Sequence, residues 1–277
     1  MTEKRKRRRK LPWRVIAWVW IAVVVILILI ASRYVDAADS PAALTDVSGL
    51  EQAAMPSGAE CQTRAYTGFT SYFSPQLHIP LCVVYELTAQ ETAGAEPRYN
   101  GNFLTDENVA GCPSHQDYTY SGYDRGHMAP AGDMKWSQTA MLESFYLTNV
   151  CPQAKSLNTG QWNNLESLVR QWAERDSALI IATGPILGDS VMTIGECQVR
   201  VPQGFYKVLL AHKAAPPRAI GFIYPNLKPT GKIADHAVTV DSVEAATGID
   251  FFAALPDDIE NAVESQCDFK QWNYRPN

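Results

Sequence analysis

The stretch SGYDRGHMAP, residues 121–130, places an acid, a guanidinium, a glycine and an imidazole in one unbroken run, Asp124-Arg125-Gly126-His127. Histidine has an ordinary pKa near 6.5, so a neutral imidazole can accept a proton at physiological pH. Arginine keeps its charge and presents a planar fork that suits a phosphate group. The same four residues also suit a polar surface turn, and the rest of the chain has to distinguish the two interpretations.

A second polar group follows in TNVCPQAKSLNTGQWNNLE, residues 148–166, which contains Asn149, Asn158 and Glu166. An amide oxygen together with water molecules forms the kind of hard ligand set that Mg²⁺ prefers. If a helix begins at Asn158, eight residues rotate by about 80°, so Asn158 and Glu166 can face one cleft. By position alone, however, Asn158 also suits a helix N-cap and Glu166 a solvated helix carboxylate.

The surrounding apolar patterns predict an α+β domain with a mostly antiparallel sheet, because strands and helices mix without regular alternation. The predicted strands are 81–89, 178–187, 204–211 and 218–226. The predicted helices are 141–148, which follows a possible N-cap at Ser137, then 162–176 and 256–266.

The first 32 residues predict a membrane anchor. A basic tail, residues 1–10, precedes an uncharged apolar run at 15–31, and the segment 11–32 approaches the ~30 Å thickness of the hydrocarbon core. The positive-inside rule then puts the tail in the cytoplasm of a single-pass cell-membrane protein and the remainder outside. A cleaved secretory signal is the alternative, and it would make the protein secreted. Residues 33–59 resemble a flexible tether, and 60–277 form one domain.

The chain has six cysteines, all in the part predicted to be exported, and none lies in a CxxC pair of the kind that binds zinc. An even number of cysteines in an exported domain favours three disulfide bonds, although the pairing does not follow from the sequence. Buried reduced thiols are the alternative.

Charge is distributed unevenly along the chain. Eight of the 24 Lys and Arg residues, but one of the 29 Asp and Glu residues, lie in residues 1–14, so the remainder has a formal charge of about −12. A body this acidic does not attract polyanions by its bulk charge. Binding of nucleic acid therefore requires a local cluster of basic side chains.

Taken together, SGYDRGHMAPAGDM and YLTNVCPQAKSLNTGQWNNLE resemble the DNA/RNA non-specific endonuclease family, which has the ββα-metal fold. Later segments such as ATGPIL, VPQGFYKVLL and GFIYPN are similar to family segments in the same order. The resemblance covers roughly residues 60–265, and the combination of the two spaced motifs is far more specific than either alone.

The resemblance implies roles for three residues of the two motifs. His127 matches the general base, Asn158 the asparagine that binds the metal, and Glu166 a glutamate next to the metal that also takes part in catalysis. The metal that it implies is Mg²⁺, with Mn²⁺ as a substitute.

Four further residues match positions that support the phosphate or the shape of the site. Arg125 and Asn149 are expected to take part in catalysis, with Arg125 also binding substrate, and Asp124 is expected to be structural. Arg98, in EPRYNGNF, is a looser match to an arginine that contacts phosphate.

The function implied is a membrane-anchored, outward-facing, metal-dependent endonuclease that hydrolyses phosphodiester bonds in DNA and RNA. Backbone recognition carries no base code, so low sequence preference is expected. The alternative is a membrane-tethered receptor that binds nucleic acid without cutting it.

Overall fold

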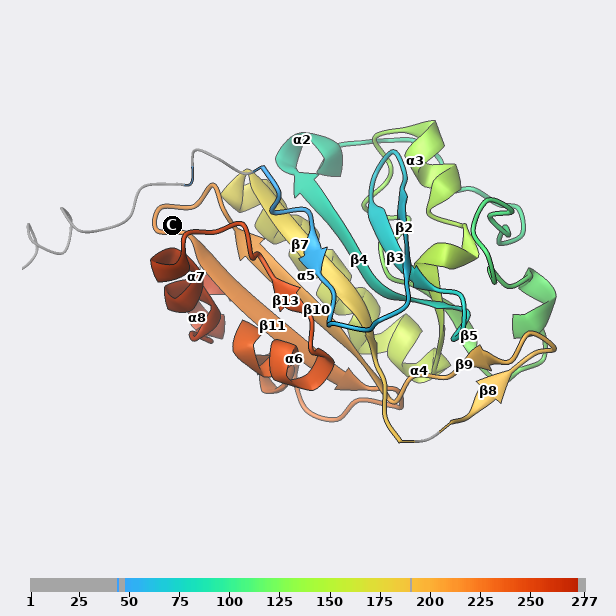
Figure 1. Ribbon diagram of the computed structural model, residues 1–277. Helices are drawn as coiled ribbons and strands as arrows, with labels where there is room; N and C mark the ends of the chain where they lie inside the picture. The colour runs from blue at the N-terminus through green and yellow to red at the C-terminus, as the bar shows by residue number, and fades with distance from the viewer. Residues whose placement is uncertain (1–43, 45–47, 190, 274–277) are drawn as a thin grey trace, which may run out of the picture. The chain divides into compact units, whose positions relative to one another are not determined.

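The computed structural model describes residues 44, 48–189 and 191–273. At its centre lies a seven-stranded sheet in which every neighbouring pair of strands is antiparallel (Figure 1), as the sequence predicted. In spatial order the strands are β12 (Ala237–Val238), β11 (Arg218–Pro225), β10 (Gly204–Ala211), β7 (Ala178–Ile186), β4 (Ile79–Thr88), β3 (Thr70–Ser74) and β2 (Gln62–Ala65).

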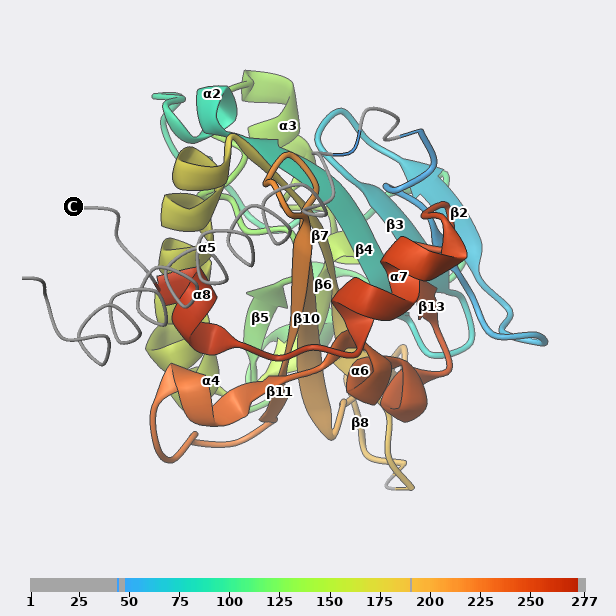
Figure 2. The same cartoon turned by 90° about the vertical axis from the view of Figure 1, so that its left-hand side faces the viewer.

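Helices cover both faces of this sheet. Figure 2 shows α5 (Asn163–Asp176) on one side and α6 (Val240–Thr247) with α7 (Asp257–Glu264) on the other. The two layers contain separate clusters of buried apolar side chains. The molecule therefore has a helical layer on each side of the sheet, and the predicted α+β class is confirmed.

Successive residues of the central strands alternate between the two layers. Ile181 of β7 and Leu209 of β10 belong to the cluster on the α5 side, whereas Ile180 and Val208 belong to the cluster on the α6 side. Because side chains along a strand point alternately to the two faces, strands buried on both sides are apolar throughout. This is why β7 and β10 appear in the sequence as largely apolar runs, with Thr183 and Lys207 as the polar exceptions.

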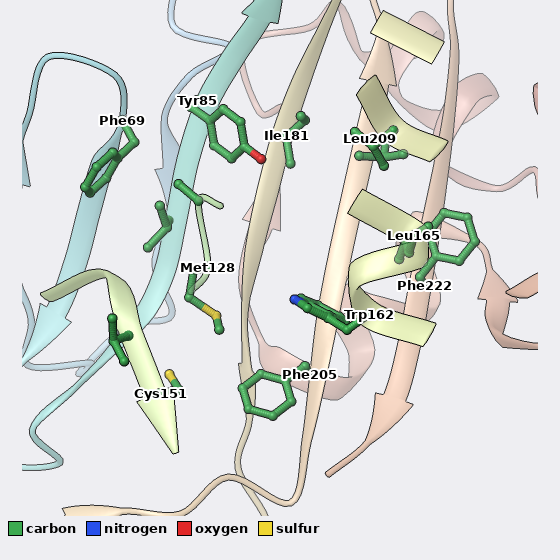
Figure 3. Close-up of a cluster of buried hydrophobic side chains, with 14 of the residues drawn as sticks. Phe69, Tyr85, Met128, Cys151, Trp162, Leu165, Ile181, Phe205, Leu209 and Phe222 are labelled. Atoms are coloured by element: carbon green, nitrogen blue, oxygen red, sulfur yellow. The ribbon is translucent and has the colours of Figure 1, made fainter. Parts of the chain in front are cut away.

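The part of the core between the sheet and α5 is built around aromatic residues. Figure 3 shows Trp162 and Leu165 on the helical segment, beside Phe205, Leu209 and Phe222 of the sheet. Trp162 is fully buried, and its ring centroid lies 5.8 Å from that of Phe205. This packing fixes where the segment before α5 lies on the sheet.

A small two-stranded sheet lies beside the large one. It pairs β5 (Asp124–His127) with β6 (Val150–Gln153), and the chain then enters α4 (Lys155–Leu157), a π-turn labelled η3 (Asn158–Trp162), and α5. Two strands followed by a helical segment are the arrangement that the resemblance implied. The two motif stretches thus form one structural unit.

The remaining elements are short. They are β1 (Ala53–Ala54), α2 (Ala89–Thr92), η1 (His115–Tyr118), α3 (Gln138–Glu143), η2 (Leu147–Asn149), β8 (Thr193–Ile194), β9 (Val199–Arg200), η4 (Ile233–His236), β13 (Asp250–Phe251) and α8 (Phe269–Asn273). The predicted N-cap of α3 is confirmed, since Oγ of Ser137 accepts a hydrogen bond from the amide of Ala140 at 3.3 Å.

The predicted membrane anchor at 11–32 lies outside the described residues. Within residues 44, 48–189 and 191–273, no helix has the length and apolar character needed to cross a membrane. Part of the predicted tether belongs to the domain, because β1 pairs with β13 and Leu50 is buried. The folded unit therefore includes residues before residue 60. The sequence did not predict strand β1 because the residues around it show no periodic apolar pattern.

The three predicted disulfide bonds are not formed, and all six cysteines are free. Cys82 and Cys151 are fully buried and belong to the two different core clusters. Buried cysteines of this kind pack as small apolar side chains. An even count of cysteines therefore gave the wrong prediction here, because burial in a large core needs no covalent link.

The core packing predicts that two leucines differ greatly in their contribution to the free energy of unfolding. Leu209→Ala should lower the free energy of unfolding by about 2–5 kcal/mol, because Leu209 is fully buried and leaves a cavity. Leu142→Ala on the surface of α3, where Leu142 is 38% exposed, should change it by less than about 1 kcal/mol. Equal losses in urea denaturation would contradict this assignment of the core.

Candidate active site

A cavity of about 580 Å³ lies where the two motif stretches meet. Its lining includes Asp124, Arg125 and His127 from β5, together with Asn158 from η3 and Glu166 from α5. The three β5 residues lie more than 30 positions before Asn158 and Glu166 in the chain. The tertiary structure thus brings these five residues, which the sequence assigned to one site, to a single cavity.

Pairing between β5 and β6 explains the glycine of the first motif. Gly126 lies opposite Cys151, and a Cβ at this position would clash with the side chain of Gln153. The backbone at Gly126 is an ordinary strand, so a left-handed conformation is not the reason for the glycine. Close packing within the small sheet is the reason, and it sets the position of the neighbouring His127.

His127 lies in an aromatic setting. Its ring centroid is 5.0 Å from those of Phe103 and Phe145. Nε2 is enclosed and has no hydrogen-bond partner among the described residues. Burial, and to a lesser degree the charge of Arg98, lowers the pKa of His127 to about 3. The imidazole is therefore neutral at physiological pH.

A hydrogen bond joins the two halves of the site. Nδ2 of Asn158 donates to Oδ2 of Asp124 at 3.0 Å. This contact uses the nitrogen of the amide and leaves the oxygen for another partner, such as a cation. No side-chain capping bond is present at the start of η3 or of α5, so Asn158 is not an N-cap.

The helical segment that carries Asn158 is not continuous. Residues 158–162 form a π-turn, in which Gly160 has φ −103° and ψ −119°, and α5 begins only at Asn163. The simple helical rotation expected from Asn158 to Glu166 is therefore wrong, although both residues line the cavity. π-turns are frequent at functional sites, and here the irregular turn presents the amide of Asn158.

Glu166 occupies an enclosed position. Burial, opposed by the charge of Lys207, raises the pKa of its carboxyl group to about 7, and the charge of Asp133 adds to this rise while Arg170 opposes it. A bound cation favours the charged form of such a carboxylate. The oxygen of Asn158 and the carboxylate of Glu166 together form an all-oxygen set that fits a hard divalent cation such as Mg²⁺.

Arg170 and Asp133 belong to the site but did not stand out in the sequence. Arg170 lines the cavity one helical turn after Glu166, and its Nη1 donates to Oδ1 of Asp133 at 2.8 Å. Asp133 is buried and also accepts a hydrogen bond from the hydroxyl of Tyr85 at 2.8 Å. Arg170 could have been proposed from the sequence because it lies four residues after Glu166 on a predicted helix, and residues with this spacing lie on the same face.

Lys207 lies behind this group rather than in the cavity. It is buried, its Nζ lies 4.9 Å from the ring centroid of Trp162, and it has no hydrogen-bond partner among the described residues. Burial lowers the pKa of Lys207, while the carboxylates of Glu166 and Asp133 oppose that shift.

The cavity supplies the local positive charge that the acidic body lacks. Arg98, Arg125 and Arg170 all line it. Nη2 of Arg125 donates to the carbonyl of His115 at 2.6 Å and to Oγ1 of Thr119 at 3.0 Å, while its Nε is enclosed without a partner among the described residues. Arg98 is exposed, 5.0 Å from the ring centroid of Phe145. Three guanidinium groups at one cavity can bind a phosphate.

Asn149 is part of the framework of the site rather than of its lining. It is fully buried, and its Oδ1 accepts from the amide of Ala129 at 2.9 Å. Its Nδ2 donates to the carbonyls of Ala129 at 2.8 Å and Ser144 at 2.9 Å. These contacts favour a role in holding the chain after His127, and a direct catalytic role for Asn149 stays a prediction.

A comparison with family models identifies the chain. The model described as DNA/RNA non-specific endonuclease matches residues 46–258. The chain belongs to the DNA/RNA non-specific endonuclease family. The resemblance inferred from the two motifs is thereby confirmed, and the match includes every residue of the cavity discussed above.

Several nucleases of known name are similar to this member of the family. The mitochondrial nuclease EXOG of Mus musculus is 35% identical over 225 residues, covering 74% of this chain and 61% of its own length. Mitochondrial endonuclease G of Bos taurus is 32% identical over 212 residues, covering 71% and 70%. This chain thus spans about 61% of the length of the mouse relative.

A solved structure agrees with the fold. The crystal structure of the EndoG/EndoGI complex, described as showing the mechanism of EndoG inhibition, matches with a TM-score of 0.67 and 30% identity. The match covers 71% of this chain and 88% of that one. It supports a mixed fold with a mostly antiparallel sheet for this family member.

The predicted location is wrong. The sequence predicted a single-pass cell-membrane protein with its domain outside the cell, but the relatives named above are mitochondrial nucleases. The physical reason lies in the signal itself, because a basic run before an apolar run is common to several targeting segments. Such a pattern indicates direction to a membrane without specifying which one.

The buried imidazole predicts how stability depends on pH. The unfolded chain binds a proton at His127 near pH 6.5, whereas the folded protein does so only near pH 3, so stability falls as the pH drops below 6.5. Between pH 7 and 4.5, wild-type protein should lose about 1–3 kcal/mol more than His127→Asn. Urea denaturation at several pH values measures this, and parallel curves for the two proteins would refute it.

Proposed function

We propose that the chain is a metal-dependent, non-specific endonuclease that hydrolyses phosphodiester bonds in DNA and RNA. The observation that carries the proposal is the composition of one cavity. A neutral imidazole, the amide of Asn158, the carboxyl group of Glu166 and three arginines all line it. Membership in a family of endonucleases supports the same conclusion.

His127 acts as the general base. A neutral imidazole in a cavity that admits a phosphodiester removes a proton from the attacking water. Burial keeps the ring neutral before the reaction, and the protonated ring formed in the reaction can return its proton to solvent through the open side of the cavity. Asn149 holds the backbone two residues further on and so orients the base.

The arginines bind the phosphate and stabilise its negative charge. Arg125 is held by the carbonyl of His115 and by Thr119, so its guanidinium is positioned before substrate binds. Charge that increases at the phosphoryl oxygens in the transition state is offset by such fixed cations. Arg98, at the exposed rim, contributes to binding, and Arg170 is oriented by Asp133.

Asn158 and Glu166 are the residues that hold a divalent cation, most simply Mg²⁺, with Mn²⁺ as a substitute. Asp124 fixes the amide of Asn158 through its nitrogen, and Glu166 supplies a carboxylate from the neighbouring helix. When bound, the cation stabilises negative charge on the phosphate and on the departing oxygen.

Substrate choice follows from what the cavity can recognise. Its arginines are suited to phosphate, and contacts with the phosphate backbone carry no base sequence. Cleavage of DNA and RNA with little sequence preference is therefore the expected activity.

Nicking of a supercoiled plasmid tests the proposal. His127→Ala should lower kcat by at least ~10²-fold, the size expected when a general base is lost. His115→Ala removes a partly exposed imidazole near the same site and keeps the backbone carbonyl that holds Arg125, so it should retain activity. Turnover near the wild-type rate in a folded His127→Ala protein would exclude His127 as the base, and binding without nicking by the wild type would favour a non-cleaving receptor.

A titration with Mg²⁺ tests the cation site. Asn158→Ala should raise the Mg²⁺ concentration needed for half-maximal activity by roughly tenfold or more, since it removes an oxygen ligand. Asn164→Ala, on an exposed position of α5, is the matched control. Full activity of the wild type in EDTA, or an unchanged titration for Asn158→Ala, would contradict the assignment.

A further inference from the structure

A second group of acids lies on the other side of the sheet. Asp241 and Glu244 of α6 and Glu264 of α7 each direct a carboxylate oxygen to one point, and these three oxygens lie within 4.8 Å of one another. Both helices pack on the face opposite α5 (Figure 2). The sheet therefore separates this group from the active-site cavity.

Glu264 is the unusual member of the group. Its side chain is 5% exposed, and its Oε1 is enclosed with no hydrogen-bond partner among the described residues. It is also the last residue of α7, where the helix dipole carries partial negative charge and disfavours another negative group. A buried carboxylate normally has a partner, either a basic group, a set of donors or a metal ion.

The negative charges around Glu264 favour the binding of a cation there. Glu244 and Asp241 from α6, Glu260 from α7 and Asp250 from β13 are the strongest charges acting on it, and all are carboxylates. Burial, followed by these charges, raises the pKa of Glu264 to about 9. Burial likewise raises the pKa of Glu244 and Glu260.

The other two carboxylates are well placed for a shared ligand. Asp241 and Glu244 are three residues apart on α6 and so lie on the same side of that helix. Oε1 of Glu244 accepts a hydrogen bond from the amide of Phe251 at 2.8 Å, which holds the side chain beside β13. Oxygens bound to one Ca²⁺ at 2.3–2.6 Å lie no more than about 5 Å apart, in agreement with the spacing here.

We propose that Asp241, Glu244 and Glu264 bind one hard divalent cation of the Ca²⁺ class, and that this ion joins α6 to α7. The ligands are all carboxylate oxygens, without the histidine or cysteine that zinc and other transition metals favour. The ion replaces the missing partner of Glu264 and offsets the repulsion among the three acids. Its role is structural, because the sheet lies between it and the catalytic groups.

Calcium binding by the full chain tests the proposal, with the Asn158→Ala protein used as background so that the active-site cation does not contribute. After removal of metal, CaCl₂ should raise the Tm of this protein in a saturable way, with one ion bound per chain in equilibrium dialysis with ⁴⁵Ca²⁺. Glu264→Gln and, separately, Asp241→Asn should each weaken binding at least tenfold. Asp258→Asn, an exposed acid of the same helix, should leave it unchanged.

Two further measurements distinguish a bound cation from a proton shared among the three carboxyl groups. Without Ca²⁺, Glu264→Gln should have a higher Tm than the Asn158→Ala parent, because it removes a carboxyl group that is ionised in the unfolded chain and has to take up a proton on folding. With Ca²⁺ the order should reverse. In the wild-type background, Glu264→Gln should retain plasmid nicking in Mg²⁺. A Tm that does not respond to Ca²⁺, or ⁴⁵Ca²⁺ binding that survives both Glu264→Gln and Asp241→Asn, would overturn the proposal.

Discussion

The hydrogen bond from Asn158 to Asp124 is the contact on which the geometry of the site depends. It joins a strand of the small sheet to the π-turn before α5, so that His127, Asn158 and Glu166 share one cavity. A single neutral-to-charged hydrogen bond contributes only about 1.5–3 kcal/mol. Its importance lies in orientation, because it uses the nitrogen of the amide and leaves the oxygen for another partner.

Buried charges reinforce this arrangement from behind. Asp133 receives hydrogen bonds from Arg170 of α5 and from Tyr85 of β4, and so connects the helix to the large sheet. Lys207 and Glu166 lie in the same enclosed region. Removing one partner from such a group leaves an uncompensated buried charge, which is strongly destabilising. The site is thus held by electrostatic contacts as well as by apolar packing.

Sequence reasoning proposed site residues whose types are chemically distinctive. An imidazole and an arginine in one short motif, followed by spaced amides and a carboxylate, suggested His127, Arg125, Asn158 and Glu166, and the structure places all four at one cavity. Arg170 was missed because an arginine on a helix is ordinarily a surface residue, and only its contact with Asp133 makes it part of the cavity. The predictions of disulfide bonds and of location were wrong, because a cysteine count does not encode distances between thiols and hydropathy does not encode which membrane or compartment the chain reaches.

The sequence by itself determined the family, the antiparallel core strands and the chemistry available to the site. These follow from local patterns, namely the apolar runs of the core strands and the two motifs around His127 and Asn158. Tertiary structure alone decided that Asn149 braces the backbone, that Gly126 accommodates Gln153, and that Glu264 is enclosed among other acids. Burial and the partners of a polar group depend on residues distant in the chain, so no local pattern could have revealed them.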